Sequence, residues 1–173
     1  MQFFSGFSLK DEESFFNDYR DTSAYNICGF SYGAIKAFQH TKELLRKGER
    51  VDRLQLFSPA FFQTKSEKFK RLQILAYSNT QEKYLKQFMQ SCFKPYAKRE
   101  VQYSQTDITQ LEELLSYEWI GSDFVELESR GVVVEVYLGG KDCIIDVTGA
   151  REFFLSVSTV TYIKEANHFL QTK

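Results

Sequence analysis

The chain has 173 residues, a length typical of one domain with a single core. Apolar residues make up 43% and charged residues 26%, with nine Gly and two Pro, so the composition excludes disordered, collagen-like and low-complexity proteins. The formal net charge of -1 excludes an overall field that would attract nucleic acid or an anionic membrane. A charged partner would therefore be met by a local patch.

The few cysteines and histidines exclude several kinds of metal and cofactor site. Cys28, Cys92 and Cys143 are odd in number and form no CxxC pair, which argues against a disulfide framework and a zinc ribbon. His40 and His168 are the only histidines, and HExxH, GxGxxG and P-loop patterns are absent. The N-terminal segment has no basic leader, and no run approaches the ~18 apolar residues of a membrane span. We expect a cytoplasmic protein without a metal.

Short β-forming runs alternate with helical patterns, which is typical of an α/β protein with a mostly parallel sheet. The most distinct run, GVVVEVYLGG, has three consecutive Val and suits a strand buried on both faces. We predict five strands, at residues 2–4, 24–29, 52–57, 132–138 and 159–164.

Two helices are predicted between the first three strands. Phe15, Phe16 and Tyr19 fall on one helical face, and Ser8 is a candidate N-cap for this first helix. After the second strand, apolar residues recur with a period near 3.6 over residues 34–45 and predict the second helix.

The β pattern disappears over residues 63–129, which read as three or four helices inserted between core strands of one domain, 1–173. The insertion is short and its apolar faces need the core to cover them, so we interpret it as a lid. Seven aromatic residues could line an acyl tunnel between lid and core, although core packing is the more common use of such side chains. They are Phe61, Phe62, Tyr84, Phe88, Phe93, Tyr117 and Trp119.

Charge is unevenly distributed along this insertion. Residues 62–103 carry nine basic and three acidic side chains, a balance of +6, whereas residues 104–130 carry one basic and seven acidic, a balance of -6. Although the whole chain is nearly neutral, the lid therefore has a basic part followed by an acidic part. A solvated surface is the ordinary explanation of such a run, and a docking site for an acidic partner is the alternative.

A G-x-S-x-G pattern lies where the second predicted strand ends and the second helix begins. Ser31 is flanked by Gly29 and Gly33, and small residues at these positions permit the tight turn that exposes a nucleophilic serine. The same turn directs the backbone N–H of Tyr32 toward a developing oxyanion at the helix N-terminus. A glycine-rich connecting loop is the alternative interpretation.

A nucleophilic serine needs a base and an acid to orient it. His168 follows the last predicted strand, whereas His40 lies in a polar run of the second helix, where a solvated histidine is expected. Asp142 directly follows the 132–138 strand, at the carboxyl edge where sites of parallel sheets form. Asp146 is the competing acid, but it is better placed to cap a helix starting near residue 147.

The order Ser31, Asp142, His168 and the flanking residues resemble the α/β-hydrolase fold family over nearly the whole chain. Ser5-Gly6-Phe7 is similar to the oxyanion loop of that family, so the resemblance implies the Phe7 backbone N–H as a second oxyanion donor. Ser5 stands where the family usually has His. The chain also begins at what is normally the third strand of the family.

Within this fold, the segments SGF, GFSYGA, GGKDCIID and NHF resemble the pimeloyl-acyl-carrier-protein methyl ester esterases. The resemblance implies a cytoplasmic serine carboxylesterase of biotin synthesis that needs no cofactor and frees the distal carboxylate of a carrier-bound pimeloyl chain. It also implies an acidic partner, the acyl carrier protein. Four basic residues of the insertion are candidates to bind it: Lys65, Lys68, Lys70 and Arg71.

Two other functions remain open from the sequence. One is a different hydrolase of the same fold, such as a thioesterase, a lactonase or a short-chain esterase, and lid geometry would distinguish these. The other is a non-catalytic binding protein that keeps the fold, against which the three residue types in the expected order argue.

Overall fold

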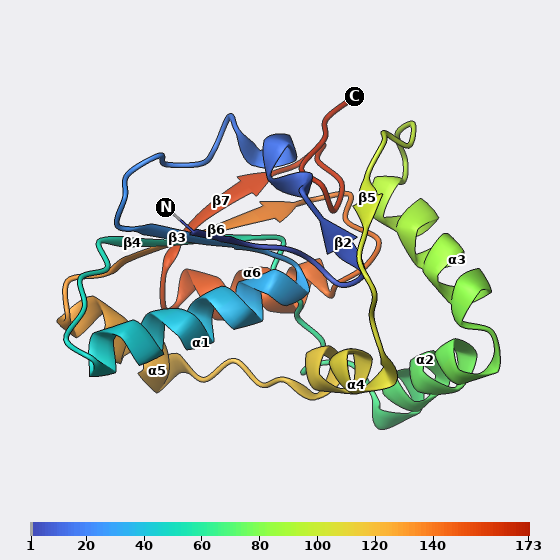
Figure 1. The fold of residues 1–173 in the computed structure, drawn as a ribbon, viewed down its shortest axis with the longest axis horizontal. Helices are drawn as coiled ribbons and strands as arrows, with labels where there is room; N and C mark the ends of the chain where they lie inside the picture. The colour runs from blue at the N-terminus through green and yellow to red at the C-terminus, as the bar shows by residue number, and fades with distance from the viewer. Residues whose placement is uncertain (1) are drawn as a thin grey trace.

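The computed structural model describes residues 2–173, and a five-stranded sheet runs through its centre (Figure 1). The strand order is β1-β3-β4-β6-β7, and every neighbouring pair is parallel. The strands are β1 (Gln2–Phe4), β3 (Asn26–Phe30), β4 (Arg53–Phe57), β6 (Val133–Gly139) and β7 (Thr159–Ile163). The predicted α/β class and its five strands are confirmed.

The parallel arrangement places the carboxyl ends of all five strands at one edge of the sheet. Central strand β3 is buried at every residue, because β1 and β4 flank it and helices and loops cover both faces. In strand β6, buried and more exposed positions alternate over most of its length. The segments that carry Ser31, Asp142 and His168 follow β3, β6 and β7, so they start from the same edge.

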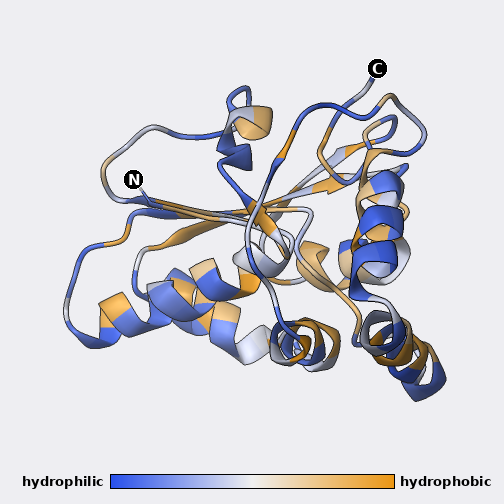
Figure 2. Cartoon of the chain, turned by 45° about the vertical axis from the view of Figure 1, so that its right-hand side comes forward, coloured by the Kyte–Doolittle hydropathy of each residue, from blue (hydrophilic) through white to orange (hydrophobic). Residues whose placement is uncertain are grey.

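Three helices cover one face of the sheet: α1 (Tyr32–Arg46), α5 (Gly121–Ser129) and α6 (Val147–Leu155) (Figure 1). An aromatic cluster joins them, in which the ring of Phe38 lies 4.7 Å from that of Phe124 and 5.3 Å from that of Trp119. Figure 2 shows the result in hydropathy: apolar strands at the centre and helices with mixed surfaces around them. Burial of these aromatic rings stabilises the packing of the helices on this face.

A short 3-10 helix, η1 (Glu12–Phe16), covers the opposite face, where the ring of Phe16 stacks on that of Phe57 at 4.7 Å. The longer helix expected here, with Ser8 as its N-cap, is not formed. Ser8 instead adopts a φ of 62° in a turn. Strand β2 (Leu9–Lys10) then pairs with β5 (Gln102–Tyr103), so the backbone is extended up to residue 10 and helical geometry begins only at residue 12.

The insertion between β4 and β6 divides into two parts. Helices α2 (Glu67–Asn79), α3 (Gln81–Phe93) and α4 (Ile108–Ser116) stand beside the carboxyl edge of the sheet, and we call them the lid helices (Figure 1). Ser66 and Asp107 cap α2 and α4. Helix α5 belongs to the same insertion in sequence, but it packs against β6 in the core.

Candidate active site

Ser31 lies on the tight turn that joins β3 to α1. Its backbone adopts φ 54° and ψ -115°, which an L-residue rarely occupies, and its side chain faces the carboxyl edge. The flanking glycines are required by close packing. A Cβ on Gly29 would lie 2.3 Å from the Gly33 carbonyl oxygen, and one on Gly33 would lie 2.0 Å from the Phe4 carbonyl oxygen. The strand, turn and helix therefore occur where the G-x-S-x-G pattern predicted them.

The structure brings Ser31, His168 and Asp142 together in one hydrogen-bonded row. His168 Nε2 lies 3.0 Å from Ser31 Oγ, and His168 Nδ1 lies 2.6 Å from Asp142 Oδ2. The side chains of His168 and Asp142 are both fully buried. Burial in this geometry lets the carboxylate hold the imidazole in the tautomer with the proton on Nδ1, which leaves Nε2 free to accept the serine proton.

Backbone groups fix the Asp142 carboxylate. Its second oxygen, Oδ1, accepts hydrogen bonds from the N–H groups of Ile144 at 2.7 Å and Ile145 at 3.3 Å. The two carboxylate oxygens therefore have separate tasks: one is held by the loop, and the other faces His168.

Asp146, the competing acid, has a different role. Its Oδ1 accepts a hydrogen bond from the Gly149 N–H at 3.2 Å and caps α6, and its Oδ2 accepts one from the Thr64 hydroxyl at 2.5 Å. The Thr64 hydrogen bond is the main cause that lowers the pKa of Asp146 below its usual value. The structure thus places Asp142, and not Asp146, on the histidine.

The two predicted oxyanion donors lie on adjoining segments. Tyr32 is the first residue of α1, where the helix dipole favours negative charge, and Phe7 lies in the loop after β1. Gly33 packs directly on this loop, because its Cβ position would lie 2.5 Å from the Ser5 carbonyl oxygen. The oxyanion role of both N–H groups stays a prediction.

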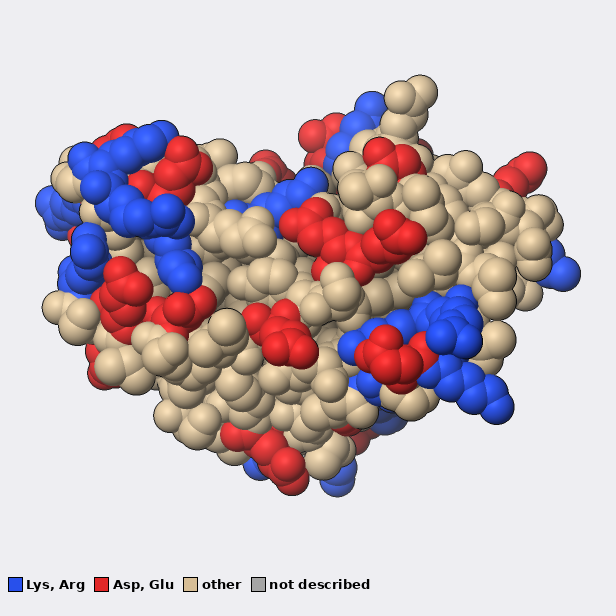
Figure 3. Space-filling model, turned by 90° about the horizontal axis from the view of Figure 1, so that it is seen from below, with Lys and Arg blue, Asp and Glu red and all other residues tan. Residues whose placement is uncertain are grey.

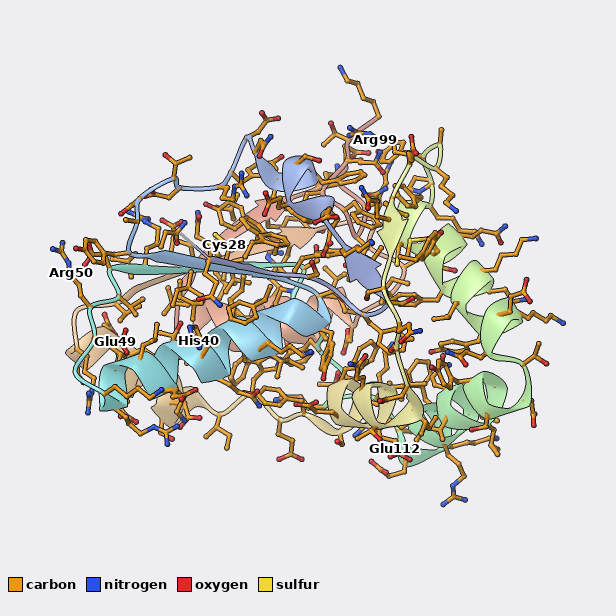
Figure 4. All side chains as sticks on the ribbon, viewed as in Figure 1. Cys28, His40, Glu49, Arg50, Arg99 and Glu112 are labelled. Atoms are coloured by element: carbon orange, nitrogen blue, oxygen red, sulfur yellow. The ribbon has the colours of Figure 1, made fainter. Side chains whose placement is uncertain are left out.

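The other histidine and Cys28 lie apart from this row. His40 is on α1 with its ring 5.3 Å from that of Phe4, and Cys28 is inside the sheet (Figure 4). Burial raises the pKa of the Cys28 thiol to about 12, which disfavours a nucleophilic thiolate. Within residues 2–173, no group of three His, Cys, Asp or Glu side chains could hold a metal ion.

A cavity of about 320 Å³ opens between the lid helices and the core. Its walls are mostly apolar and include Phe7 of the oxyanion loop and Cys143, which directly follows Asp142. Of the seven aromatic residues considered for a tunnel, Phe62, Tyr84 and Phe88 line this cavity. Phe61, Phe93 and Trp119 are buried in the core instead, and Tyr117 is partly buried against it. The cavity thus lies between the oxyanion loop and the loop that carries Asp142.

Two lid contacts at the site were not anticipated from sequence. Tyr32 donates a hydrogen bond from its hydroxyl to Glu113 Oε2 on α4, at 2.5 Å. The side-chain Nδ2 of Asn167 donates one to the Phe93 carbonyl oxygen at the end of α3, and its Oδ1 accepts from the N–H groups of Phe169 and Gln171. Tyr32, next to the serine, and Asn167, next to the histidine, are therefore hydrogen-bonded to the lid. Only the adjacency of Asn167 to His168 could have indicated the second contact.

No protein-family model and no curated protein matches this chain. Its structure is similar to that of an esterase from Exiguobacterium antarcticum, with a TM-score of 0.61, 16% identity, and coverage of 82% of this chain and 58% of the other. It is similar to naproxen esterase from Bacillus subtilis, with a TM-score of 0.53, 18% identity, and coverage of 85% and 54%. It is also similar to E-2-(acetamidomethylene)succinate hydrolase, with a TM-score of 0.57 and 11% identity. The match covers 97% of this chain and 84% of the other.

These similarities, together with the parallel sheet and the turn at Ser31, define the chain as having an α/β-hydrolase fold. The sheet is a truncated version of that fold, and a helical insertion stands over its carboxyl edge. The chain spans little more than half of the lengths of the two esterases. None of the helices in residues 2–173 combines the length and the apolarity that a bilayer crossing requires.

Proposed function

We propose that this chain is a serine carboxylic-ester hydrolase. The observation that carries the proposal is the row of hydrogen bonds from Ser31 through His168 to Asp142, on a strained turn at the carboxyl edge of the sheet. A nucleophile, a base and a group that orients the base are the parts that acyl transfer needs. The esterase neighbours of the fold agree with this choice of reaction class.

The chemistry follows from the atoms in the row. Ser31 Oγ attacks the ester carbonyl carbon while His168 Nε2 takes the hydroxyl proton, and the Tyr32 and Phe7 N–H groups stabilise the oxyanion. The tetrahedral intermediate expels the alcohol, to which His168 returns the proton. Water then attacks the acyl-enzyme with the same base, which releases the acid and restores Ser31. Asp142 stabilises the imidazolium during both acylation and deacylation, and no cofactor takes part.

For the substrate, we propose the methyl ester of a pimeloyl chain carried by the acyl carrier protein, in biotin synthesis. The motifs SGF, GFSYGA, GGKDCIID and NHF support this choice. The apolar cavity of about 320 Å³ beside Phe7 suits a medium-length acyl chain. The products are methanol and pimeloyl-acyl-carrier protein, and the proposed location is the cytoplasm.

Basic side chains on helix α2 support an acidic carrier as partner. Lys68 and Arg71 are exposed on its outer face, and Leu72 and Leu75 lie exposed between them and the end of the helix. In Figure 3, Lys and Arg gather over the lid at the right and also at the opposite end, with mostly acidic side chains between them. Lys70 is already paired with Glu67 at 3.1 Å. We therefore expect Lys68 and Arg71 to contribute most to docking.

Neutralising the lid charges should distinguish a carrier-dependent enzyme from a general esterase. Changing all four candidates to Gln is expected to lower kcat/KM for the carrier-bound ester about tenfold or more and to leave a small soluble ester almost unaffected, because these charges act on encounter and docking. The substituted residues are Lys65, Lys68, Lys70 and Arg71. Steady-state kinetics on both substrates, at ~0.01 M and ~0.15 M salt, measures the effect and its screening.

A matched control removes four exposed basic residues from the end of the molecule opposite the lid, near Arg50 in Figure 4. These are Arg46, Lys47, Arg50 and Arg130, each changed to Gln, and this variant is expected to keep the carrier reaction close to wild type. Equal losses in the two variants, or no loss in the lid variant, would show that α2 is only a solvated surface.

Mass spectrometry of the carrier tests the proposed reaction directly. Methyl pimeloyl-acyl-carrier protein is incubated with the enzyme, and the expected product has lost one methyl group and kept its thioester. Release of the whole acyl chain would instead identify a thioesterase. An unchanged carrier, with hydrolysis of small esters intact, would keep the ester hydrolase and reject this substrate.

A further inference from the structure

The carboxyl group of Glu12 is buried beside the candidate site, and the reaction as described does not use it. The side chain belongs to η1, and the residue is only 1% exposed. Its Oε1 accepts a hydrogen bond from the backbone N–H of Gly6 at 2.6 Å. Burial is the main cause that raises the pKa of Glu12 above its usual value. Burial of a carboxyl group costs free energy of folding, so we expect this group to have a function.

The contact fixes one end of the oxyanion loop. The Gly6 N–H is held by Glu12, and the Gly6 carbonyl oxygen accepts a hydrogen bond from the Leu9 N–H at 3.1 Å. Gly6 also packs closely on the core, because a Cβ at this residue would lie 2.9 Å from the ring of Phe30. The backbone N–H and C=O of Gly6 are therefore both held by hydrogen bonds, and they belong to two successive peptide units. The Gly6 C=O lies in the same peptide plane as the Phe7 N–H, so the Leu9 contact sets the direction of that N–H, and Glu12 holds the peptide plane before it.

The side chain of Phe7 shows that the loop must hold one orientation. Its ring is 2% exposed, lines the cavity and meets the ring of Phe88 edge to face at 5.8 Å. A loop that rotated would withdraw this ring from the cavity wall and reorient the Phe7 N–H. The Leu9 turn constrains the loop from one side, and Glu12 constrains it from the other.

We propose that Glu12 is a positioning residue of the oxyanion hole: its carboxyl group holds the Gly6 N–H and thereby aims the Phe7 N–H at the substrate oxygen. The inference rests on the proposed ester hydrolysis at Ser31. Because the Phe7 N–H acts most strongly on the charge of the tetrahedral intermediate, loss of Glu12 should lower kcat and hardly change KM.

The test compares Glu12→Gln with Glu12→Leu on p-nitrophenyl acetate. Gln keeps an acceptor for the Gly6 N–H and is expected to stay within about threefold of wild-type kcat, whereas Leu has similar bulk and no acceptor. Loss of a whole oxyanion donor costs about 10²–10³-fold in kcat, so misdirection by Glu12→Leu is expected to cost about 10 to 100-fold. Glu13→Leu, on the same short helix but exposed, is the matched control and should retain wild-type kcat.

The affinity for a boronic acid distinguishes a change in the oxyanion hole from general destabilisation of the protein. Phenylboronic acid forms a tetrahedral adduct on a serine and places an oxygen in the oxyanion hole, so its affinity should fall in Glu12→Leu by about the same factor as kcat. A loss that appears in KM with boronate affinity unchanged would overturn the proposal. So would wild-type kcat in Glu12→Leu, or an equal loss in Glu12→Gln.

Two further measurements keep the outcome decisive. If Glu12→Leu does not fold, Glu12→Asp withdraws the carboxylate by one methylene and should show a smaller loss in both kcat and boronate affinity; wild-type values for both would overturn the proposal. Hydrogen exchange of the Gly6 amide, faster in Glu12→Leu or Glu12→Asp than in wild type, reports on the loop without turnover. If Ser31→Ala still hydrolyses the ester at the wild-type rate, the proposed function is rejected. The exchange rate of the Gly6 amide would still show whether Glu12 holds the loop.

Discussion

Ser31→Ala is expected to lower ester turnover by about 10⁴-fold or more and to leave the melting temperature almost unchanged. The substitution removes the atom that attacks the carbonyl carbon and leaves His168 Nε2 with no nucleophile at 3.0 Å. It removes little packing, because only one oxygen atom is lost and the turn keeps its backbone. Turnover of p-nitrophenyl acetate and thermal unfolding of the same samples measure both effects.

Ser58 offers a matched control for this experiment. It is also a buried serine with a positive φ, 41°, at the carboxyl end of the neighbouring strand β4, but its hydroxyl makes no hydrogen bond among the described residues. Ser58→Ala should therefore retain most of the activity. His168→Ala should match the loss in Ser31→Ala, because the members of such a unit act together. Substantial activity in either of these two variants would contradict the assigned nucleophile and base.

Asp142→Asn is expected to lower kcat by about 10⁴-fold. Because the loop N–H groups of Ile144 and Ile145 already donate to one side of the side chain, an amide here keeps its oxygen on them and turns its NH₂ group toward His168. His168 Nδ1 would then have to accept, which places the ring proton on Nε2. A protonated Nε2 cannot take the proton of Ser31.

The control for this substitution is Asp146→Asn. An Asn at position 146 still accepts from the Gly149 N–H, so the cap of α6 persists and kcat should stay within about threefold of wild type, with a small change in stability. Steady-state kinetics and thermal unfolding of the two variants provide the comparison. A greater loss in Asp146→Asn than in Asp142→Asn would show that the acid is wrongly assigned.

Much of this site was predictable, because parallel strands impose a strong geometric constraint. Once β3, β6 and β7 are recognised from their apolar runs, their carboxyl ends must lie at one edge, where the loops that follow them can bring polar residues together. The glycines around Ser31 and the capping position of Asp146 are also local signals. A choice between Asp142 and Asp146 was therefore possible before their contacts with His168 and Gly149 were known.

Local patterns were less informative where a distant segment competes for the same backbone. The pattern of Phe15, Phe16 and Tyr19 predicts a longer helix than the structure contains. Pairing of β2 with β5, which lies some ninety residues away in sequence, keeps residues 9–10 extended and shortens the helix to η1. The whole of residues 63–129 is likewise predicted as a lid, but the last helix of this range, α5, packs on β6, and its Phe124 contacts Phe38 of α1 and Phe154 of α6.

The role of Glu12 could not be predicted from the sequence. In an acidic stretch beside Asp11 and Glu13 it has every sign of a solvated carboxylate, and no spacing distinguishes it from its neighbours. Its burial and its bond to Gly6 arise only when η1 folds back over the sheet and Phe16 stacks on Phe57. The positions of the five strands and the reactive turn depend on periodicity and local backbone geometry, which a sequence carries directly. Which carboxyl group becomes buried depends on packing between distant segments, and that is a property of the whole fold.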